Sequence, residues 1–184
     1  AYDAVSYVRQ VGIMNGTSAT TFEPDGQVRT NEVIKCLMVM LGYKSIAEVN
    51  GGYPTGYLKF SQRINLTQGA PSEEFCSRGS IAIILKNVMD ENVLIETSYN
   101  ELGEIDFAYD SNRTFASEIL GLQKVKGIMT DNGYTSIIGD SLYGGEKIVV
   151  DNTLFRVPEG KEFASFIGRD IDLWYTNYKS NDPG

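Results

Sequence analysis

The sequence predicts an α+β protein, in which an N-terminal pair of helical repeats precedes a small β-rich domain folded as a barrel or a curled sheet. In the first half of the chain, an amphipathic run, a glycine turn, a loop and a second amphipathic run occur twice in that order. In the second half, short β-type runs alternate with tight-turn residues. The expected domains are helical repeats over residues 1–91 (at 1–43 and 51–90), a linker or irregular cover over 92–112, and a β-rich domain over 113–184.

The first repeat should contain two helices. Valines recur at roughly helical spacing over residues 5–11, and a broad apolar stripe covers residues 33–41. Thr30 is the expected N-cap of the second helix, and Gly42 suits its end. Because neither helix can bury its stripe alone, we expect the helices of the two repeats to pack together.

The second repeat has the same order with a shorter loop. Apolar residues at helical spacing over residues 57–64 predict its first helix. Ser77 is the expected N-cap of its second helix, whose apolar face runs over residues 81–88.

The remaining chain is expected to form two short helices and several strands. Residues 115–120 should form the first helix, after Thr114, and residues 161–168 the second, ended by Gly168. The expected strands cover residues 122–130, 134–138, 147–150, 153–157 and 170–177. The run Val125–Met129 echoes the glycine turn of the first repeat. No amphipathic helix of adequate length precedes it, so we interpret it as a strand.

Composition excludes several classes of partner. The net charge is −8 and the isoelectric point is about 4.6, which argues against general affinity for nucleic acids or anionic membranes. No apolar run approaches the length of a membrane span. The first residues resemble the middle of a helix, so we expect the chain to be part of a longer one whose leader or anchor lies outside it.

The sequence does not favour catalysis. Histidine is absent, which removes the commonest general base and transition-metal ligand. Cys36 is expected to pack as a small hydrophobe, although a single bridge to Cys76 stays open. Acidic pairs (Asp140 with Asp151, Asp170 with Asp172) offer oxygen ligands for calcium, but neither pair follows a known calcium-loop spacing. We therefore expect no enzyme activity, no cofactor and no metal.

Several motifs of the first half resemble the S-layer homology family. Residues 12–16 match its Gly-Ile-x-x-Gly turn, and residues 21–25 match its Phe-x-Pro loop. Residues 29–32, Arg-Thr-Asn-Glu, stand where the family has Thr-Arg-x-Glu. Residues 52–58, 66–69 and 77–79 resemble a degenerate second repeat of clostridial-type surface proteins. The second half is similar, more weakly, to a β domain that accompanies such repeats.

The resemblance implies a non-catalytic module of a secreted Gram-positive surface protein. Such repeats attach proteins non-covalently to anionic, pyruvylated polysaccharide of the cell wall, which implies an extracellular location at the wall or S-layer. The family's arginine maps onto Arg78 in the second repeat and onto Thr30 in the first, where Arg29 lies one place earlier. The implied polymer-binding residues are Arg78, Arg29, Thr30, Gly16 and Gly69.

Two alternatives remain open at this stage. The chain could be a structural spacer with vestigial repeats, in contact with other surface-layer chains. A binding groove predicts that Arg78 is exposed in a concavity beside Gly69, whereas a spacer predicts that a local carboxylate holds Arg78. A third hypothesis, sugar binding by the β-rich domain, requires exposed aromatic side chains on one face.

Overall fold

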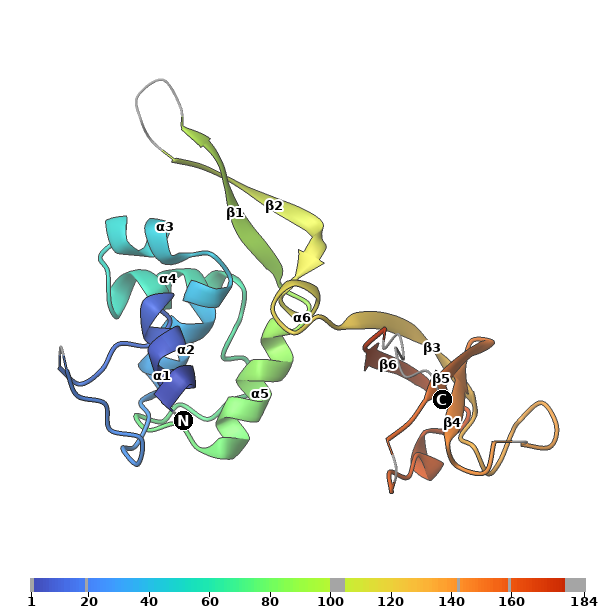
Figure 1. Cartoon of the computed structure of the whole chain (residues 1–184). Helices are drawn as coiled ribbons and strands as arrows, with labels where there is room; N and C mark the ends of the chain where they lie inside the picture. Colours follow the sequence, from blue (N-terminus) through green and yellow to red (C-terminus); the bar gives the residue numbers. More distant parts are fainter. Residues whose placement is uncertain (1, 19, 100–104, 142, 159, 178–184) are drawn as a thin grey trace. The chain divides into compact units, whose positions relative to one another are not determined.

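The computed structural model describes every residue except 1, 19, 100–104, 142, 159 and 178–184 (Figure 1). The chain is α+β, as expected, and divides into two compact units. The first unit covers residues 1–121 and the second covers residues 122–184.

Helices occupy the regions that the sequence indicates in the first unit. They are α1 (Tyr2–Gln10), α2 (Thr30–Met40), α3 (Lys44–Val49), α4 (Thr55–Arg63) and α5 (Arg78–Val88). The short helix α3 has no counterpart in the prediction. Ser77 caps α5 as expected, because its side chain accepts a hydrogen bond from the backbone N–H of Ser80 at 3.1 Å.

The core of the first unit joins α2 to α5 with the chain that follows them. Its buried side chains include Met38, Leu41, Tyr57, Leu66, Ile84 and Val88. None of the described side chains of α1 is among the buried residues of this cluster. The burial of α2, α4 and α5 on one side each agrees with their amphipathic patterns.

Residues 92–112 do not form the expected linker. The segment belongs to an antiparallel hairpin of β1 (Asn92–Tyr99) and β2 (Ile105–Thr114). An isolated hairpin is at best marginally stable in water. Here Val93 and Leu94 are buried in the helical core, and the backbone N–H of Leu94 donates to the carbonyl of Leu41 at 2.8 Å. Tertiary contacts thus stabilise strands that the polar sequence does not reveal.

The boundary between the units also differs from the expected one at residue 113. Helix α6 (Phe115–Glu118) is capped by Thr114 and belongs to the first unit. The ring of Phe115 is 1% exposed and packs in the helical core. The backbone N–H groups of Phe115 and Ala116 donate to the carbonyls of Glu91 and Met89. These contacts attach α6 to the end of α5, so the second unit begins after it.

The second unit is a curled four-stranded antiparallel sheet, which confirms the expected architecture. The strands β3 (Gln123–Asp131), β4 (Lys147–Val150), β5 (Thr153–Arg156) and β6 (Asp170–Tyr175) lie in the order β5-β4-β3-β6. A 3-10 helix, η1 (Ala164–Phe166), precedes β6. The core is small: Met129, Ile148 and Val150 are buried, with partly buried apolar side chains around them.

The strand expected at residues 134–138 is absent; only an isolated bridge between Asp131 and Ser136 forms there. The side chain of Asn132 explains the difference. Its Oδ1 accepts hydrogen bonds from the backbone N–H groups of Tyr134 and Thr135, at 3.0 and 2.8 Å. Those donors are therefore lost to a strand ladder, and the chain turns back into a loop.

Candidate functional site

A short antiparallel pairing joins the segments that lead into α2 and α5. The backbone N–H of Thr30 donates to the carbonyl of Glu74 at 2.9 Å, and that of Cys76 donates to the carbonyl of Val28 at 2.8 Å. Arg29 and Phe75 face each other in this pairing. The expected site residues Arg29 and Thr30 therefore lie next to the strand-like segment that ends just before Arg78.

Arg29 is engaged with its neighbours. It forms an ion pair with Glu74, and its guanidinium carbon lies 5.2 Å from the centroid of the Phe75 ring. About half of the Arg29 side chain remains exposed. Its backbone N–H donates to a carboxylate oxygen of Glu32 at 2.8 Å, so Glu32 caps the start of α2.

Thr30 is not the N-cap that the sequence predicts. Arg29 occupies the cap position, and Thr30 is the first residue of α2. The hydroxyl of Thr30 donates to the carbonyl of Glu73 at 2.6 Å, which fastens it to the segment before α5. The Thr30 hydroxyl is therefore used in the pairing with the segment before α5 and does not cap the helix.

Arg78 differs from Arg29. It is the first residue of α5, the position that Thr30 holds in α2, and its side chain is exposed. Among the described residues, no carboxylate forms an ion pair with Arg78. The exposure of Arg78 is one of the features that the binding hypothesis expects, whereas the concavity beside Gly69 that it also expects stays a prediction.

Two exposed aromatic side chains lie in this part of the first unit, and no sequence motif singles out Phe75. Phe75 is 41% exposed and Tyr53 is 50% exposed. Partial burial and the carboxylate of Glu32 raise the pKa of the Tyr53 hydroxyl, whereas Arg29 lowers it. The ring of Phe75 lies against Arg29 because the segments before α2 and α5 pair.

Gly16 and Gly69, the two glycines among the expected site residues, have conformational roles in the structure. Helix α1 ends with Gly12 at a φ of 74°, so Gly16 is not its terminating glycine. A Cβ on Gly16 would lie 2.1 Å from the carbonyl oxygen of Thr21, which makes glycine necessary for that tight loop. Gly69, at a φ of 77°, lies near Ile83, more than one helical turn beyond Arg78.

The two thiols do not form a disulfide. Cys36 and Cys76 are free and partly buried. The Sγ of Cys36 donates to the carbonyl of Ile13 at 3.3 Å, and burial raises the pKa of this thiol. A protonated thiol is a poor nucleophile. Within the described part of the chain, no three acidic or cysteine side chains gather as metal ligands.

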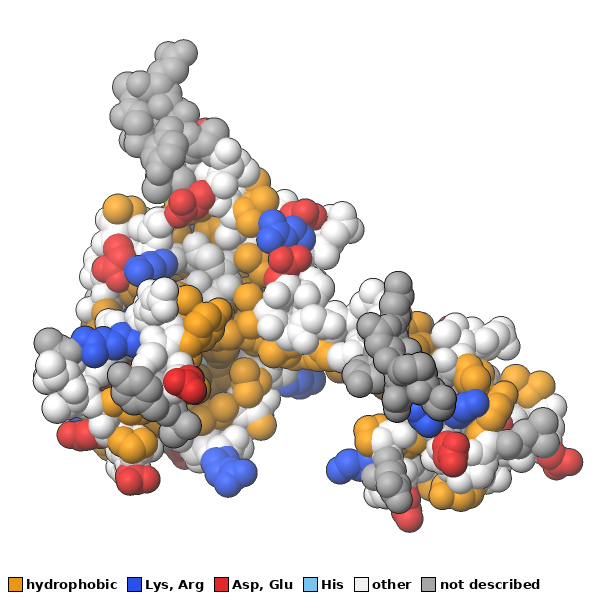
Figure 2. Space-filling model, in the orientation of Figure 1, with side chains coloured by type: hydrophobic (Ala, Val, Ile, Leu, Met, Phe, Trp, Pro, Cys, Tyr) orange, Lys and Arg blue, Asp and Glu red, His pale blue; other side chains and the backbone are white. Residues whose placement is uncertain are grey.

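The surface of the first unit carries charges of both signs together with apolar side chains. Figure 2 shows acidic, basic and apolar side chains interspersed over one face of the first unit, with apolar side chains gathered beside α5. None of the described helices is long and apolar enough to cross a lipid bilayer.

Comparison of the chain with known protein families, with curated proteins and with solved structures gave no match.

Proposed function

We propose that the protein is a non-catalytic module that attaches a secreted protein to anionic polysaccharide of a Gram-positive cell wall, through the start of α5. One observation carries this proposal: Arg78 is an exposed arginine at a helix N-terminus and has no carboxylate partner among the described residues. The resemblance to S-layer homology repeats supplies the class of ligand, a pyruvylated wall polymer, and the location at the wall or S-layer.

The backbone at the start of α5 favours an anion. Ser77 accepts the N–H groups of Ser80 and Ile81 through its side chain and its carbonyl. The N–H groups of Arg78 and Gly79 have no acceptor among the described residues. A helix N-terminus with unpaired N–H groups and a guanidinium is a suitable receptor for a carboxylate. Gly79 adds no side chain to obstruct the approach.

The start of α2 is less available to a ligand carboxylate than the start of α5, so the two helix starts have different roles in the proposed binding. The backbone N–H of Thr30 and its hydroxyl are both occupied by the segment before α5, and Arg29 is paired with Glu74. What this side offers is the pair of exposed rings, Phe75 and Tyr53, on which sugar rings can stack. The polymer's charge is therefore assigned to Arg78 and part of its apolar contact to these rings.

A second candidate function is that of a structural module that contacts other surface-layer chains. The ion pair between Arg29 and Glu74 favours it, because a ligand carboxylate would have to displace Glu74. The net charge of −8 also opposes an anionic polymer at long range. This function requires no polymer, so a binding measurement separates the two.

Replacing Arg78 with alanine should weaken binding to the isolated wall polymer by about tenfold or more, because a hydrogen bond to a charged group contributes about 1.5–3 kcal/mol. Isothermal titration calorimetry with the purified polymer measures the loss. Lys86→Ala is the matched control, since Lys86 is an exposed cation in the last turn of the same helix. Equal losses in the two variants would mean that general charge attraction, and not the helix start, holds the polymer.

A further inference from the structure

Asparagine is followed by glycine at three places in the chain: residues 15–16, 50–51 and 132–133. Asparagine is one of the thermally labile residues of proteins. Its side-chain amide carbon is open to attack by the backbone nitrogen of the next residue, and a glycine there has no side chain to obstruct the approach. The attack requires that both groups are free to meet in the right geometry. The hydrogen bonds of the two groups therefore decide which pair reacts.

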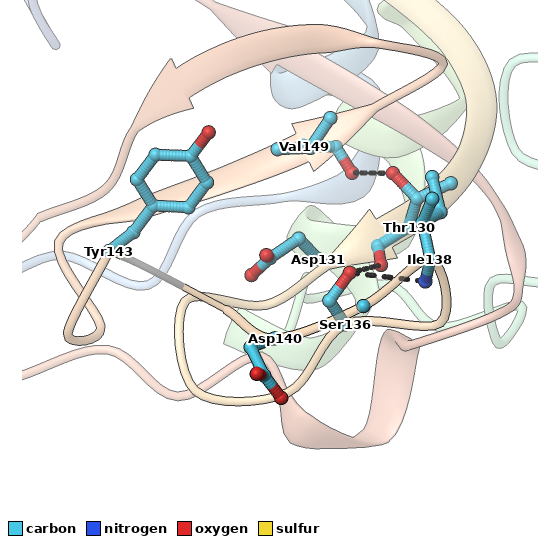
Figure 3. Close-up of a pocket in the computed structure, with 8 residues that line it drawn as sticks. Thr130, Asp131, Ser136, Ile138, Asp140, Tyr143 and Val149 are labelled. Carbon is cyan, nitrogen blue, oxygen red and sulfur yellow. Dashed lines mark hydrogen bonds between the residues drawn. The ribbon is translucent and has the colours of Figure 1, made fainter.

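The pair Asn132–Gly133 is held at both reacting groups. The backbone N–H of Gly133 donates to Oδ1 of Asp131 at 2.6 Å, and Oδ1 of Asn132 accepts the next two backbone N–H groups at 3.0 and 2.8 Å. Asn132 is only 5% exposed. Figure 3 shows that the following loop is also fixed, because the hydroxyl of Ser136 donates to the carbonyl of Thr130. This pair can react only after these hydrogen bonds break.

The pair Asn50–Gly51 is held through its side chain. The Nδ2 of Asn50 donates to the carbonyl of Ile46 at 2.8 Å, and its Oδ1 accepts from the Nζ of Lys59 at 2.7 Å. Both ends of the amide are thus bound, and both hydrogen bonds must break before the amide can rotate. The second pair is therefore protected as well.

The pair Asn15–Gly16 lies between α1 and α2, and Asn15 is exposed. Within the described part of the chain, neither the Asn15 side chain nor the N–H of Gly16 has a hydrogen-bond partner. The chain is fastened on either side of them. The carbonyl of Ile13 accepts from two side chains of α2 at 3.3 Å, and the hydroxyls of Thr17 and Thr21 are hydrogen-bonded at 3.0 Å. The reacting groups thus lie in a free stretch between two anchored points.

We propose that Asn15 is a site of spontaneous deamidation. The backbone nitrogen of Gly16 loses its proton and bonds to Cγ of Asn15. The bond between Cγ and Nδ2 breaks, and the side-chain nitrogen leaves with that proton as ammonia. A succinimide ring remains. Water, the only co-reactant, then opens the ring at either of its two carbonyl carbons. The products are aspartate and isoaspartate, in which the main chain runs through the former side chain.

The modification changes both the charge and the length of this loop. Each product adds one negative charge, and isoaspartate also adds one carbon to the main chain before Gly16. The loop is tight at this point, since a Cβ on Gly16 would lie 2.1 Å from the carbonyl oxygen of Thr21. A longer main chain therefore has to displace the loop. The site lies outside the start of α5, and the proposal does not depend on polymer binding.

Peptide mapping by mass spectrometry of the whole chain, incubated in its folded state, tests the proposal. Cleavage after lysine and arginine places each pair in its own peptide (residues 10–29, 45–59 and 127–147), and each peptide contains a single asparagine. We expect the first peptide to gain one mass unit, faster in mildly alkaline than in mildly acidic buffer, because the attacking nitrogen must lose its proton. The other two should react about tenfold more slowly or less, since each must first open locally.

Three comparisons make the result decisive. In urea the three rates should converge, because unfolding removes the hydrogen bonds that protect residues 50 and 132. Asn15→Gln should abolish the gain in the first peptide. Electron-transfer fragmentation should detect isoaspartate beside aspartate, the signature of the ring.

Equal rates of the three pairs in the folded protein would overturn the proposal. A difference in rate that persists in urea would also contradict it, since the cause would then lie in the local sequence. Aspartate without isoaspartate would exclude the succinimide, and a mass gain that survives in Asn15→Gln would place the reaction at another residue.

Discussion

Replacing Gly42 with alanine should lower the free energy of unfolding of the first unit by about 3 kcal/mol or more. Gly42 follows α2 with a φ of 89°, where a side chain costs about 1–2 kcal/mol. A Cβ at this position would lie 2.0 Å from the carbonyl oxygen of Leu94, so the base of the β1–β2 hairpin would have to move. That movement would break the hydrogen bond between Leu94 and Leu41 and open the core.

Gly69→Ala is the matched control for this effect. Gly69 also has a positive φ, of 77°, but its nearest neighbour would be the Ile83 side chain at an ordinary 3.9 Å. We therefore expect a loss of only about 1–2 kcal/mol there, from backbone strain alone. Urea unfolding followed by circular dichroism at 222 nm measures both variants. Equal losses would show that the hairpin is not packed against α2.

Phe115→Ala should destabilise the first unit by about 3–5 kcal/mol and leave the second unit unchanged. The Phe115 ring is 1% exposed within the helical core, and removal of such a ring leaves a cavity. Trp174 lies in β6 and is the chain's single tryptophan, so its fluorescence reports the second unit. Circular dichroism at 222 nm reports mainly the helices of the first unit. We expect only the helical transition to move to lower urea concentration.

Met129→Ala is the reciprocal variant. Met129 is 1% exposed in the core of the second unit, and its truncation should move the Trp174 transition by a similar amount while the helical transition stays in place. If Phe115→Ala instead shifted the Trp174 transition, residues 113–121 would belong to the β-rich unit, as the sequence predicts. A shift of both probes in both variants would mean that the chain unfolds as one unit.

Local signals in the sequence were sufficient for much of the fold. The apolar stripes of α2, α4 and α5 and the cap at Ser77 are properties of short segments, and the structure has them where the pattern places them. The turn at Asp151 and Asn152 is of the same kind. Both residues have positive φ values, of 43° and 65°, which these residue types tolerate and a tight hairpin requires.

The features that the sequence did not reveal depend on distant contacts. The strand β1 carries one short apolar run, Val93–Ile95, and its packing in the helical core beside Leu41 and Gly42 stabilises it. Residues 134–138 have strand-forming composition, but Asn132 accepts the backbone N–H groups of the first two, Tyr134 and Thr135. In each case the conformation of the segment depends on a residue outside it, which the segment's own hydrophobic pattern does not show.

The candidate site also has parts that the sequence could predict and parts that it could not. Arg78 could be singled out from its motif; it is exposed and begins α5, and its role in binding stays a prediction. The neighbourhood of Arg29, in contrast, is formed by pairing with the segment before α5, so neither its ion pair with Glu74 nor the exposed ring of Phe75 follows from the motif.

Co-sedimentation of the protein with purified Gram-positive cell-wall sacculi tests the central claim most directly. One set of sacculi retains the secondary polysaccharide, and the other has been stripped of it. We expect the protein to pellet with the first set and to stay in solution with the second, because the exposed Arg78 and the unpaired N–H groups at the start of α5 require the polymer's carboxylates. Pelleting no greater than that of an unrelated acidic protein would contradict polymer attachment and leave the structural module as the function.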